Sequence, residues 1–266
     1  MITFAAMAAL KQKIVETELC AYSVEACRIA AACGVLRAEL CASPWEGGTT
    51  PSAAAIELAR EVGGLRLHVM IRPRGGDFLY SEDEFRQMLR EVRFARRCGA
   101  DGVVAGVLTA GGDVDVVRTR RLVEEAEGMD VTFHRAFDMT RDMLRALDDI
   151  AEAGCSRILT SGGCNTAAEG AAMLRELVSR AGGRLTIMAG SGIRPGNVAE
   201  IVSTGVGAVH FSARALHGSG MAYRKESISM GGSGSVPEYG YYEADPETVR
   251  AIVRSAGGLN GHTYIK

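Results

Sequence analysis

Short apolar runs alternate with longer segments of helical period along most of this chain. Eight runs have the length and composition of buried strands: Val15–Ala21, Val35–Cys41, Leu65–Ile71, Gly102–Leu108, Val131–Phe137, Arg157–Ser161, Leu185–Ala189 and Ala208–Phe211. Helical segments lie between them, for example Ser81–Cys98, Asp115–Glu127, Thr140–Ala153 and Ala167–Arg180. Because the runs are continuously apolar more than alternating, they are typical of a parallel sheet covered by helices.

Residues at the boundaries of these segments support the same alternation of strands and helices. Possible N-cap residues open several helices, and a glycine precedes strand after strand, as expected when a C′ glycine ends each helix. Eight strand–helix units in about 240 residues predict an α/β fold, a single (β/α)8 TIM barrel. A doubly wound open sheet is disfavoured, because no GxGxxG follows the first strand and because nearly every strand has a polar end.

The rhythm changes near the two ends of the sequence. Residues 1–14 are interpreted as an N-terminal extension, and residues 15–266 as one barrel domain. The Gly-, Ser- and Tyr-rich segment Gly218–Tyr242 predicts a long loop over one end of the barrel. Asp245-Pro246 then starts a last helix, so the barrel carries a C-terminal loop and helix extension.

Composition limits the classes of partner. The chain has 266 residues, of which 47% are hydrophobic, enough for a sizeable core. Its net charge of −2 offers no footprint for nucleic acid or an anionic membrane. No apolar run approaches the ~18 residues of a membrane span. Seven scattered cysteines without a CxxC predict free thiols in a reducing compartment, with the cytoplasm as the expected location.

The tetrapeptide Glu-Leu-Cys-Ala ends two consecutive predicted strands. Glu18 and Cys20 share one strand face, as do Glu39 and Cys41, and the two strands would be neighbours about 4.8 Å apart. If this face points into the barrel, two carboxylates lie beneath two thiols at the catalytic end. Thiolates would select a soft ion such as Cu(I) or Zn, whereas buried cysteines without chemistry behave as small hydrophobes.

Charged residues follow two other strands. Arg72 and Arg74 stand in the loop after the third strand, and His134, Arg135 and Asp138 stand at the end of the fifth. Buried charges are costly, so these residues are candidates for acid–base catalysis or charge binding, although a rim ion-pair network would also place them there.

Two histidines fall outside this group. His68 and His210 each lie in a predicted strand with no adjacent carboxylate, so we interpret both as structural.

Glycine-rich turns follow the sixth and seventh strands. Gly162-Gly163 and Gly190-Ser191-Gly192 would let backbone N–H groups meet an anion, which is the usual place of a phosphate site in barrels. Tight turns need glycine in any case, so the motif alone is weak. No lysine falls in a predicted strand, which argues against a Schiff-base aldolase.

Taken in order, the two ELCA segments, GGTTPS (47–52), HVMIRPRGGDF (68–78), GADGVVAGVLT (99–109), TFHRAFD (132–138), LTSGG and MAGSGI resemble the CutC family of copper homeostasis proteins. The resemblance spans roughly Val15 to Ser255. It implies a cytoplasmic, homo-oligomeric TIM barrel associated with Cu(I), with Cys20 and Cys41 as its thiolate ligands.

Two hypotheses remain open at this point. The first is a copper homeostasis protein that binds Cu(I) through thiolates at the barrel mouth. The second is a barrel enzyme, an isomerase, epimerase or lyase without a Schiff base, acting on a small anionic or phosphorylated sugar-like substrate. Its predicted catalytic residues are Glu18, Glu39, Arg72, His134, Arg135 and Asp138. Its predicted anion-binding residues are Gly162, Gly163, Gly190, Ser191 and Gly192. Both hypotheses expect a copper ion or a small anion as ligand, and neither expects nucleic acid or membrane.

Overall fold

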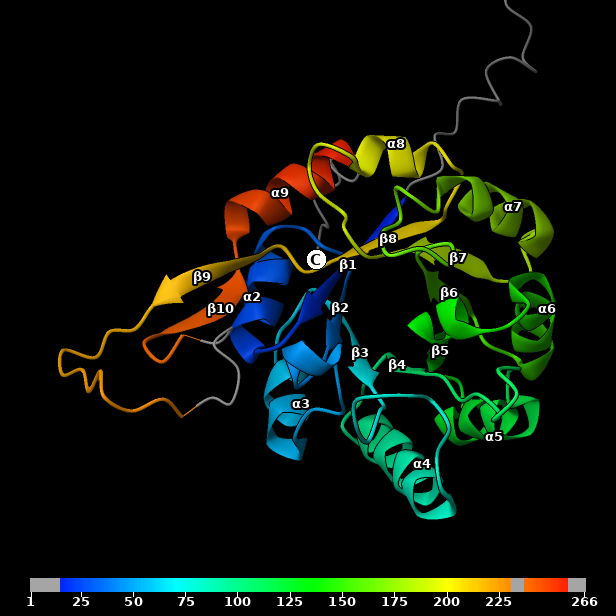
Figure 1. The fold of residues 1–266 in the computed structure, drawn as a ribbon, viewed down its shortest axis with the longest axis horizontal. Helices are drawn as coiled ribbons and strands as arrows, with labels where there is room; N and C mark the ends of the chain where they lie inside the picture. The colour runs from blue at the N-terminus through cyan, green and yellow to red at the C-terminus, as the bar shows by residue number, and fades with distance from the viewer. Residues whose placement is uncertain (1–14, 231–236, 258–266) are drawn as a thin grey trace, which may run out of the picture.

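A closed barrel of eight parallel strands forms the centre of the molecule (Figure 1). The computed structural model describes residues 15–230 and 237–257, so the extension expected at residues 1–14 lies outside the described residues. The strands pair in sequence order and β8 closes on β1. They are β1 (Glu16–Ala21), β2 (Arg37–Leu40), β3 (Arg66–Met70), β4 (Gly102–Ala105), β5 (Asp130–Phe133), β6 (Arg157–Thr160), β7 (Thr186–Ala189) and β8 (Ala208–Phe211). The predicted TIM barrel is confirmed.

Helices surround the barrel, one after each strand (Figure 1). They are α2 (Val24–Ala32), α3 (Ala53–Arg60), α4 (Glu82–Arg97), α5 (Val116–Ala126), α6 (Met143–Ala153), α7 (Ala171–Ala181), α8 (Val198–Val202) and α9 (Pro246–Ser255). Helix α9 packs beside α8 and α2 and so takes the place of the eighth helix. Within the described ranges, none of these helices has the length and apolar character that crossing a membrane requires.

Local capping explains where the helices begin. Ser81 caps α4 in a capping box with Glu84, as a serine followed three residues later by glutamate predicts. Helix α6 begins after the cap Asp142 and not after Thr140, and α7 begins only at Ala171. In both cases the predicted helix was too long by a few residues at its N-terminus.

The fifth strand is shorter than predicted. It ends at Phe133, and His134 becomes the N-cap of a 3-10 helix, η2 (Arg135–Met139), because its side chain accepts a hydrogen bond from the N–H of Ala136. A second 3-10 helix, η1 (Pro44–Glu46), follows β2, but its N-cap Ser43 adopts a left-handed conformation and makes no capping hydrogen bond with its side chain. Pro44, His134 and Arg135 from these two segments line the cavity at the mouth of the barrel.

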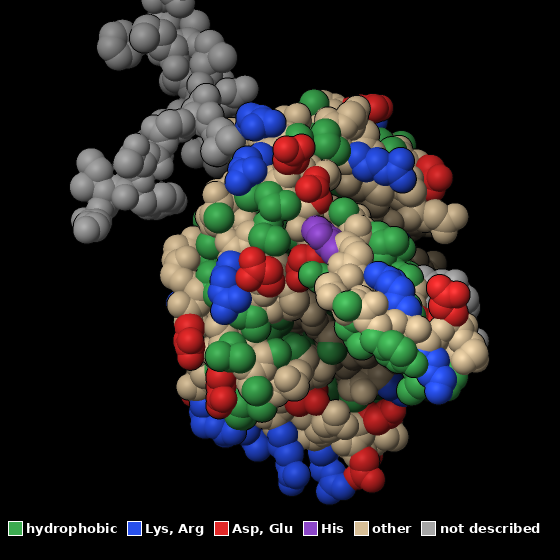
Figure 2. Space-filling view, turned by 90° about the vertical axis from the view of Figure 1, so that its left-hand side faces the viewer, with side chains coloured by type: hydrophobic (Ala, Val, Ile, Leu, Met, Phe, Trp, Pro, Cys, Tyr) green, Lys and Arg blue, Asp and Glu red, His purple; other side chains and the backbone are tan. Residues whose placement is uncertain are grey.

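The segment after β8 forms an arm that projects from the barrel (Figure 1). Its base is a two-stranded antiparallel sheet of β9 (Arg214–Gly218) and β10 (Gly240–Ala244), so the predicted loop ends in strands that the sequence analysis missed. Figure 2 views this side of the molecule and shows acidic and basic side chains scattered among apolar ones over it.

Ionisable side chains fill much of the barrel interior. The large apolar core lies between the barrel and its helices, whereas Glu18, Arg37, Glu39 and His68 are all buried in strands of the barrel. Barrel interiors are more often filled by layers of branched apolar side chains. The polar interior therefore lies directly beneath the mouth of the barrel.

Candidate functional site

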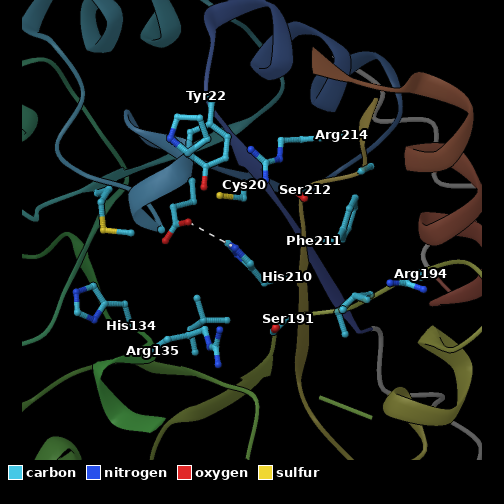
Figure 3. A pocket seen from close by; sticks show the side chains of 18 of the residues that line it. Cys20, Tyr22, His134, Arg135, Ser191, Arg194, His210, Phe211, Ser212 and Arg214 are labelled. Carbon is cyan, nitrogen blue, oxygen red and sulfur yellow. Dashed lines mark ion pairs between the residues drawn. The ribbon is translucent and has the colours of Figure 1, made fainter. Parts of the chain in front are cut away.

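The carboxyl ends of the strands surround a cavity of about 620 Å³ (Figure 3). Its walls include Cys20, Glu39, His134, Ser191 and His210, which come from opposite sides of the barrel. Several residues expected from the sequence to act together therefore share one cavity.

Three side chains of the cavity wall converge at one side of it, and the buried thiol of Cys41 lies against them. Candidate ligand atoms of Cys20, Glu39 and His210 all lie within 4.8 Å of one another. The Sγ of Cys41 lies 3.4 Å from Oε2 of Glu39, and Nε2 of His210 lies 3.5 Å from the same oxygen, the contact dashed in Figure 3. We call Cys20, Glu39, Cys41 and His210 the four-residue cluster.

Strand register explains this convergence. Cys20 of β1 is the pairing partner of Glu39 in β2, and His210 of β8 is the partner of Glu18 in β1. Because β8 pairs with β1 when the barrel closes, a residue far along the chain reaches the two ELCA segments. The expectation that His210 lacks a neighbouring carboxylate is therefore wrong, since adjacency was sought only along the sequence.

Glu18 lies fully buried beneath the cluster and links it to Arg37. We call the buried pair Glu18 and Arg37 the barrel floor. Its carboxylate pairs with Nε of Arg37, and its Oε1 lies 2.8 Å from Nδ1 of His210. Burial alone would raise the pKa of Glu18, but Arg37 and His210 hold that pKa well below its ordinary value. Burial would likewise lower the pKa of His210, but Glu39 and Cys20 raise it well above the ordinary value.

Glu39 carries a buried oxygen without a partner. The residue is 1% exposed, and its Oε1 accepts no hydrogen bond from the described residues. Burial raises the pKa of Glu39 well above its ordinary value, against the influence of His210. An unsatisfied buried polar atom costs about 1–3 kcal/mol, so an unpaired oxygen in a cavity wall is a candidate contact for a ligand.

The two thiols of the cluster differ in protonation. Hydrogen bonds with Cys41 and His210 hold the pKa of Cys20 well below its ordinary value despite burial. Burial raises the pKa of Cys41, and the neighbouring Cys20 raises it further. By contrast, burial raises the pKa of Cys27 and of Cys155 to about 12. Since the thiolate is the form that binds metals, Cys20 is the thiol of these four that most readily provides a metal ligand.

Arg72 is committed to backbone carbonyls. Its guanidinium donates to the carbonyls of Glu46 and Gly48 and to that of Gly76, at 2.6–2.9 Å. It also stacks on the ring of Phe78. Arg72 thereby fastens the loops after β2 and β3 to each other, which leaves only part of its donor capacity for a ligand.

His134 is a neutral histidine in the cavity wall. Burial and the neighbouring Arg72 lower its pKa to about 3. Its Nδ1 accepts the N–H of Ala136, so the proton of the neutral ring belongs on Nε2. That Nε2 has no hydrogen-bond partner among the described residues and is a candidate donor.

Asp138 occupies the donors of the Gly162-Gly163 turn. Its carboxylate accepts the N–H groups of Ser161 and Gly163 at 3.1 Å, and Arg135 donates to it at 2.8 Å. Because a carboxylate of the chain already fills this turn, an external anion would have to compete with it. Catalysis by Arg135 and Asp138, and anion binding by Gly162 and Gly163, stay predictions.

The turn after β7 differs from the one after β6. The N–H of Gly190 bonds to Thr160 within the sheet, whereas Ser191 and Gly192 line the cavity with positive φ of 75° and 72°. In the described part of the chain, the N–H groups of Ser191 and Gly192 make no hydrogen bond. These two residues are the members of the predicted anion set with donors still available.

Sequence reasoning missed several residues of the site. His210 and Arg37 belong to the barrel interior, and Arg194 and Arg214 line the cavity. Arg37 lies two residues before Glu39 on the same strand face, a spacing that could have revealed it. Arg214 gave no signal, because its place depends on the arm.

Over most of its length, the chain is similar to known proteins of one family. The sequence model of the CutC family matches residues 15–215. A family protein CutC from Chromobacterium violaceum is 51% identical over 236 residues, covering 88% of this chain and 95% of that protein. One from Bacteroides fragilis is 50% identical over 237 residues, covering 88% and 93%.

Solved structures agree with the fold. The CutC crystal structure from Streptococcus agalactiae is 32% identical with a TM-score of 0.72, and the match covers 74% of this chain and 98% of that one. Thiamine phosphate pyrophosphorylase from Pyrococcus furiosus is only 16% identical with a TM-score of 0.56, covering 95% of this chain and all of that one, and supports the fold alone.

Proposed function

Because this chain belongs to the CutC family, we propose that it acts in copper homeostasis by binding Cu(I) at the four-residue cluster. The Streptococcus agalactiae relative is named for copper homeostasis. In this proposal copper is cargo, and Cys20 and Cys41 supply its thiolate ligands. A cytoplasmic location and a homo-oligomeric state remain predictions that accompany it.

The observation that carries the proposal is the convergence of Cys20, Glu39 and His210 within 4.8 Å, with the thiol of Cys41 beside Glu39. Soft thiolates are the protein ligands that Cu(I) prefers. The low pKa of Cys20 favours the form that binds metal. Met70, whose thioether is also a soft donor, packs in the same small buried group as the two cysteines.

The surroundings of His210 support a metal site in a second way. A histidine that binds a metal through one ring nitrogen usually donates its other N–H to a carboxylate, which fixes the ring. His210 has this arrangement: Nδ1 contacts Glu18, and Nε2 is turned toward Glu39. We therefore propose Glu39 and His210 as further ligands or as close neighbours of the bound ion.

The test is a Cu(I) titration under anaerobic conditions in competition with a colorimetric Cu(I) chelator. The parent protein should take up a single Cu(I) per chain with an affinity above that of the double variant Cys20→Ser/Cys41→Ser. The matched control is Cys98→Ser/Cys164→Ser, which removes two thiols outside the cluster and should bind as the parent does. Equal affinity and stoichiometry in parent and Cys20→Ser/Cys41→Ser would refute the site.

An enzyme is the second candidate, favoured by the size and polarity of the cavity. A volume of about 620 Å³ is within the range of small-molecule sites. Glu39 is a carboxyl with a raised pKa beside His210, a combination suited to proton transfer. The carboxylate of Glu18 is paired with Arg37, and that of Asp138 is bound by the turn after β6. Glu39 is therefore the carboxyl group that we assign as the acid–base group of an isomerase, epimerase or lyase reaction.

This candidate is tested by proton exchange. Small sugar phosphates would be incubated with the protein in D2O and followed by NMR, which detects loss of a carbon-bound proton or formation of an isomer. Exchange by the parent that is lost in Glu39→Gln would support the enzyme. No exchange with any substrate at millimolar concentration would remove it and leave copper binding.

A further inference from the structure

The mouth of the cavity is rich in positive charge. Arg72, Arg135, Arg194 and Arg214 line it and outnumber the carboxyl groups of Glu39 and Asp245 in the same lining. Among these four arginines, only Arg135 forms an ion pair with a described residue, at 2.8 Å from Asp138. Such a rim attracts anions and repels cations through the field that it adds to the cavity. A free copper cation would approach the four-residue cluster against this field.

Arg214 is held in place by aromatic rings. Its guanidinium lies 5.3 Å from the ring of Tyr22, 5.5 Å from that of Trp45 and 5.9 Å from that of Tyr242. Cation–π contacts fix an arginine without using its N–H donors. Figure 3 shows Arg214 and Tyr22 on the same side of the cavity as Cys20. The arginine is therefore oriented next to the cluster with its donors available.

The cavity is also larger than a single ion requires. Its 620 Å³ would accept a small organic molecule beside the ion. Arg194 and the free N–H groups of Ser191 and Gly192 lie along one part of its wall, and Arg214 lies beside the cluster. These donors suit carboxylate oxygens, which accept charge-assisted hydrogen bonds.

We propose that Cu(I) reaches the cluster as an anionic complex with a low-molecular-weight thiol that carries carboxylate groups. This inference rests on the proposed function. The thiol sulfur holds Cu(I) near Cys20, while its carboxylates bind Arg194, Arg214 and the turn after β7. Because the complex is negatively charged, the arginines at the mouth of the cavity attract it, whereas they would repel a free copper cation.

Transfer of the ion is a ligand exchange without oxidation or reduction. The donor complex holds Cu(I) between the thiolates of two small molecules, and these two Cu–S bonds break as two Cu–S bonds form to the thiolate of Cys20 and to Cys41. Cys41 gives up its proton, which one leaving thiolate accepts, while the other leaves as a thiolate. Copper remains Cu(I), and the total charge is the same on both sides.

The experiment compares two copper donors by stopped-flow fluorescence. Cu(I)–glutathione carries carboxylates and is anionic, whereas Cu(I)–cysteamine carries ammonium groups and is cationic. Trp45 is the chain's one tryptophan and lies against Arg214, so its fluorescence reports events at the mouth. The charge-neutral variant is Arg194→Gln/Arg214→Gln, and the matched control is Arg175→Gln/Arg254→Gln, two exposed arginines outside the cavity lining.

The parent and the control should take Cu(I) from glutathione at least about tenfold faster than from cysteamine. Arg194→Gln/Arg214→Gln should lower this ratio toward one, and high salt should lower it in the parent as well. A ratio that stays the same in the variant would overturn the inference. If chelator competition still shows binding that depends on Cys20 and Cys41, the proposed function survives that result; if it does not, both fail.

Discussion

The substitution Glu18→Gln tests whether the charged floor of the barrel supports the cluster. It keeps the shape of the side chain and removes the charge between Arg37 and His210. Both Glu18 and Arg37 are fully buried, and the carboxylate contacts both neighbours directly. The variant therefore leaves a buried guanidinium with Glu16 as its remaining carboxylate partner.

Removing one member of a buried ion pair typically costs about 3–5 kcal/mol, because the other charge stays buried and poorly paired. For a domain of this size each 1 kcal/mol moves the melting temperature by about 2–4 °C, so the expected loss is about 6–20 °C. The double variant Glu18→Leu/Arg37→Met removes both charges and should recover much of this loss, since apolar replacements of buried pairs are often tolerated.

Acid should affect parent and variant differently. The pKa of Glu18 lies below its ordinary value of about 4.3 in the folded state, so the pair stabilises fully at pH values above 4.3. That contribution is lost as the pH falls below about 4.3. The free energy of unfolding of the parent should therefore fall more steeply between pH 5 and pH 3 than that of Glu18→Gln.

The assay is urea unfolding followed by circular dichroism, at a series of pH values. The control is Glu152→Gln, which removes the partner of Arg120 in an exposed ion pair and should leave the urea midpoint nearly unchanged. If Glu18→Gln behaves like this control, or if Glu18→Leu/Arg37→Met is no more stable than Glu18→Gln, the reasoning about the barrel floor is refuted.

Two further predictions concern the same interior. Glu39→Gln should raise the urea midpoint at pH 8, opposite to Glu18→Gln. The folded protein holds a proton on Glu39 that the unfolded chain releases as the pH rises, so Glu39 destabilises the fold at this pH and the uncharged glutamine does not. An unchanged or lower midpoint would contradict this. Gly102→Ala should cost about 1–3 kcal/mol in the same assay, since the added methyl would lie 2.6 Å from Cε1 of His68, whereas Gly63→Ala meets nothing within 4 Å and should unfold like the parent.

The barrel could be predicted from the sequence because its signals are local. Apolar runs, helix caps and the glycines that end helices each depend on a few neighbouring residues, as Gly154 shows by ending α6 at a φ of 95°. The strands β9 and β10 lacked such a signal. Their pairing joins segments more than twenty residues apart, and their side chains are mostly exposed.

The candidate site could be predicted only in part, for the same reason. The ELCA repeats brought Cys20 and Glu39 together because consecutive strands of a barrel are neighbours. His210 required knowledge of which strand closes the barrel. The turn at Gly162-Gly163 looked open in sequence, and only the fold brings the carboxylate of Asp138 onto its N–H groups.

Burial of charge in this barrel makes sense as support for the cluster. A barrel filled with branched apolar side chains would be the more stable solution, since desolvation of Glu18 and Arg37 has a large cost. In return, Glu18 fixes the ring of His210, and Arg37 fixes Glu18. All of these residues stand on strands, which hold a site more precisely than loops do. The geometry of Cys20, Glu39 and His210 is therefore set by the strands of the barrel, whereas Arg214 lines the same cavity from β9, outside the barrel.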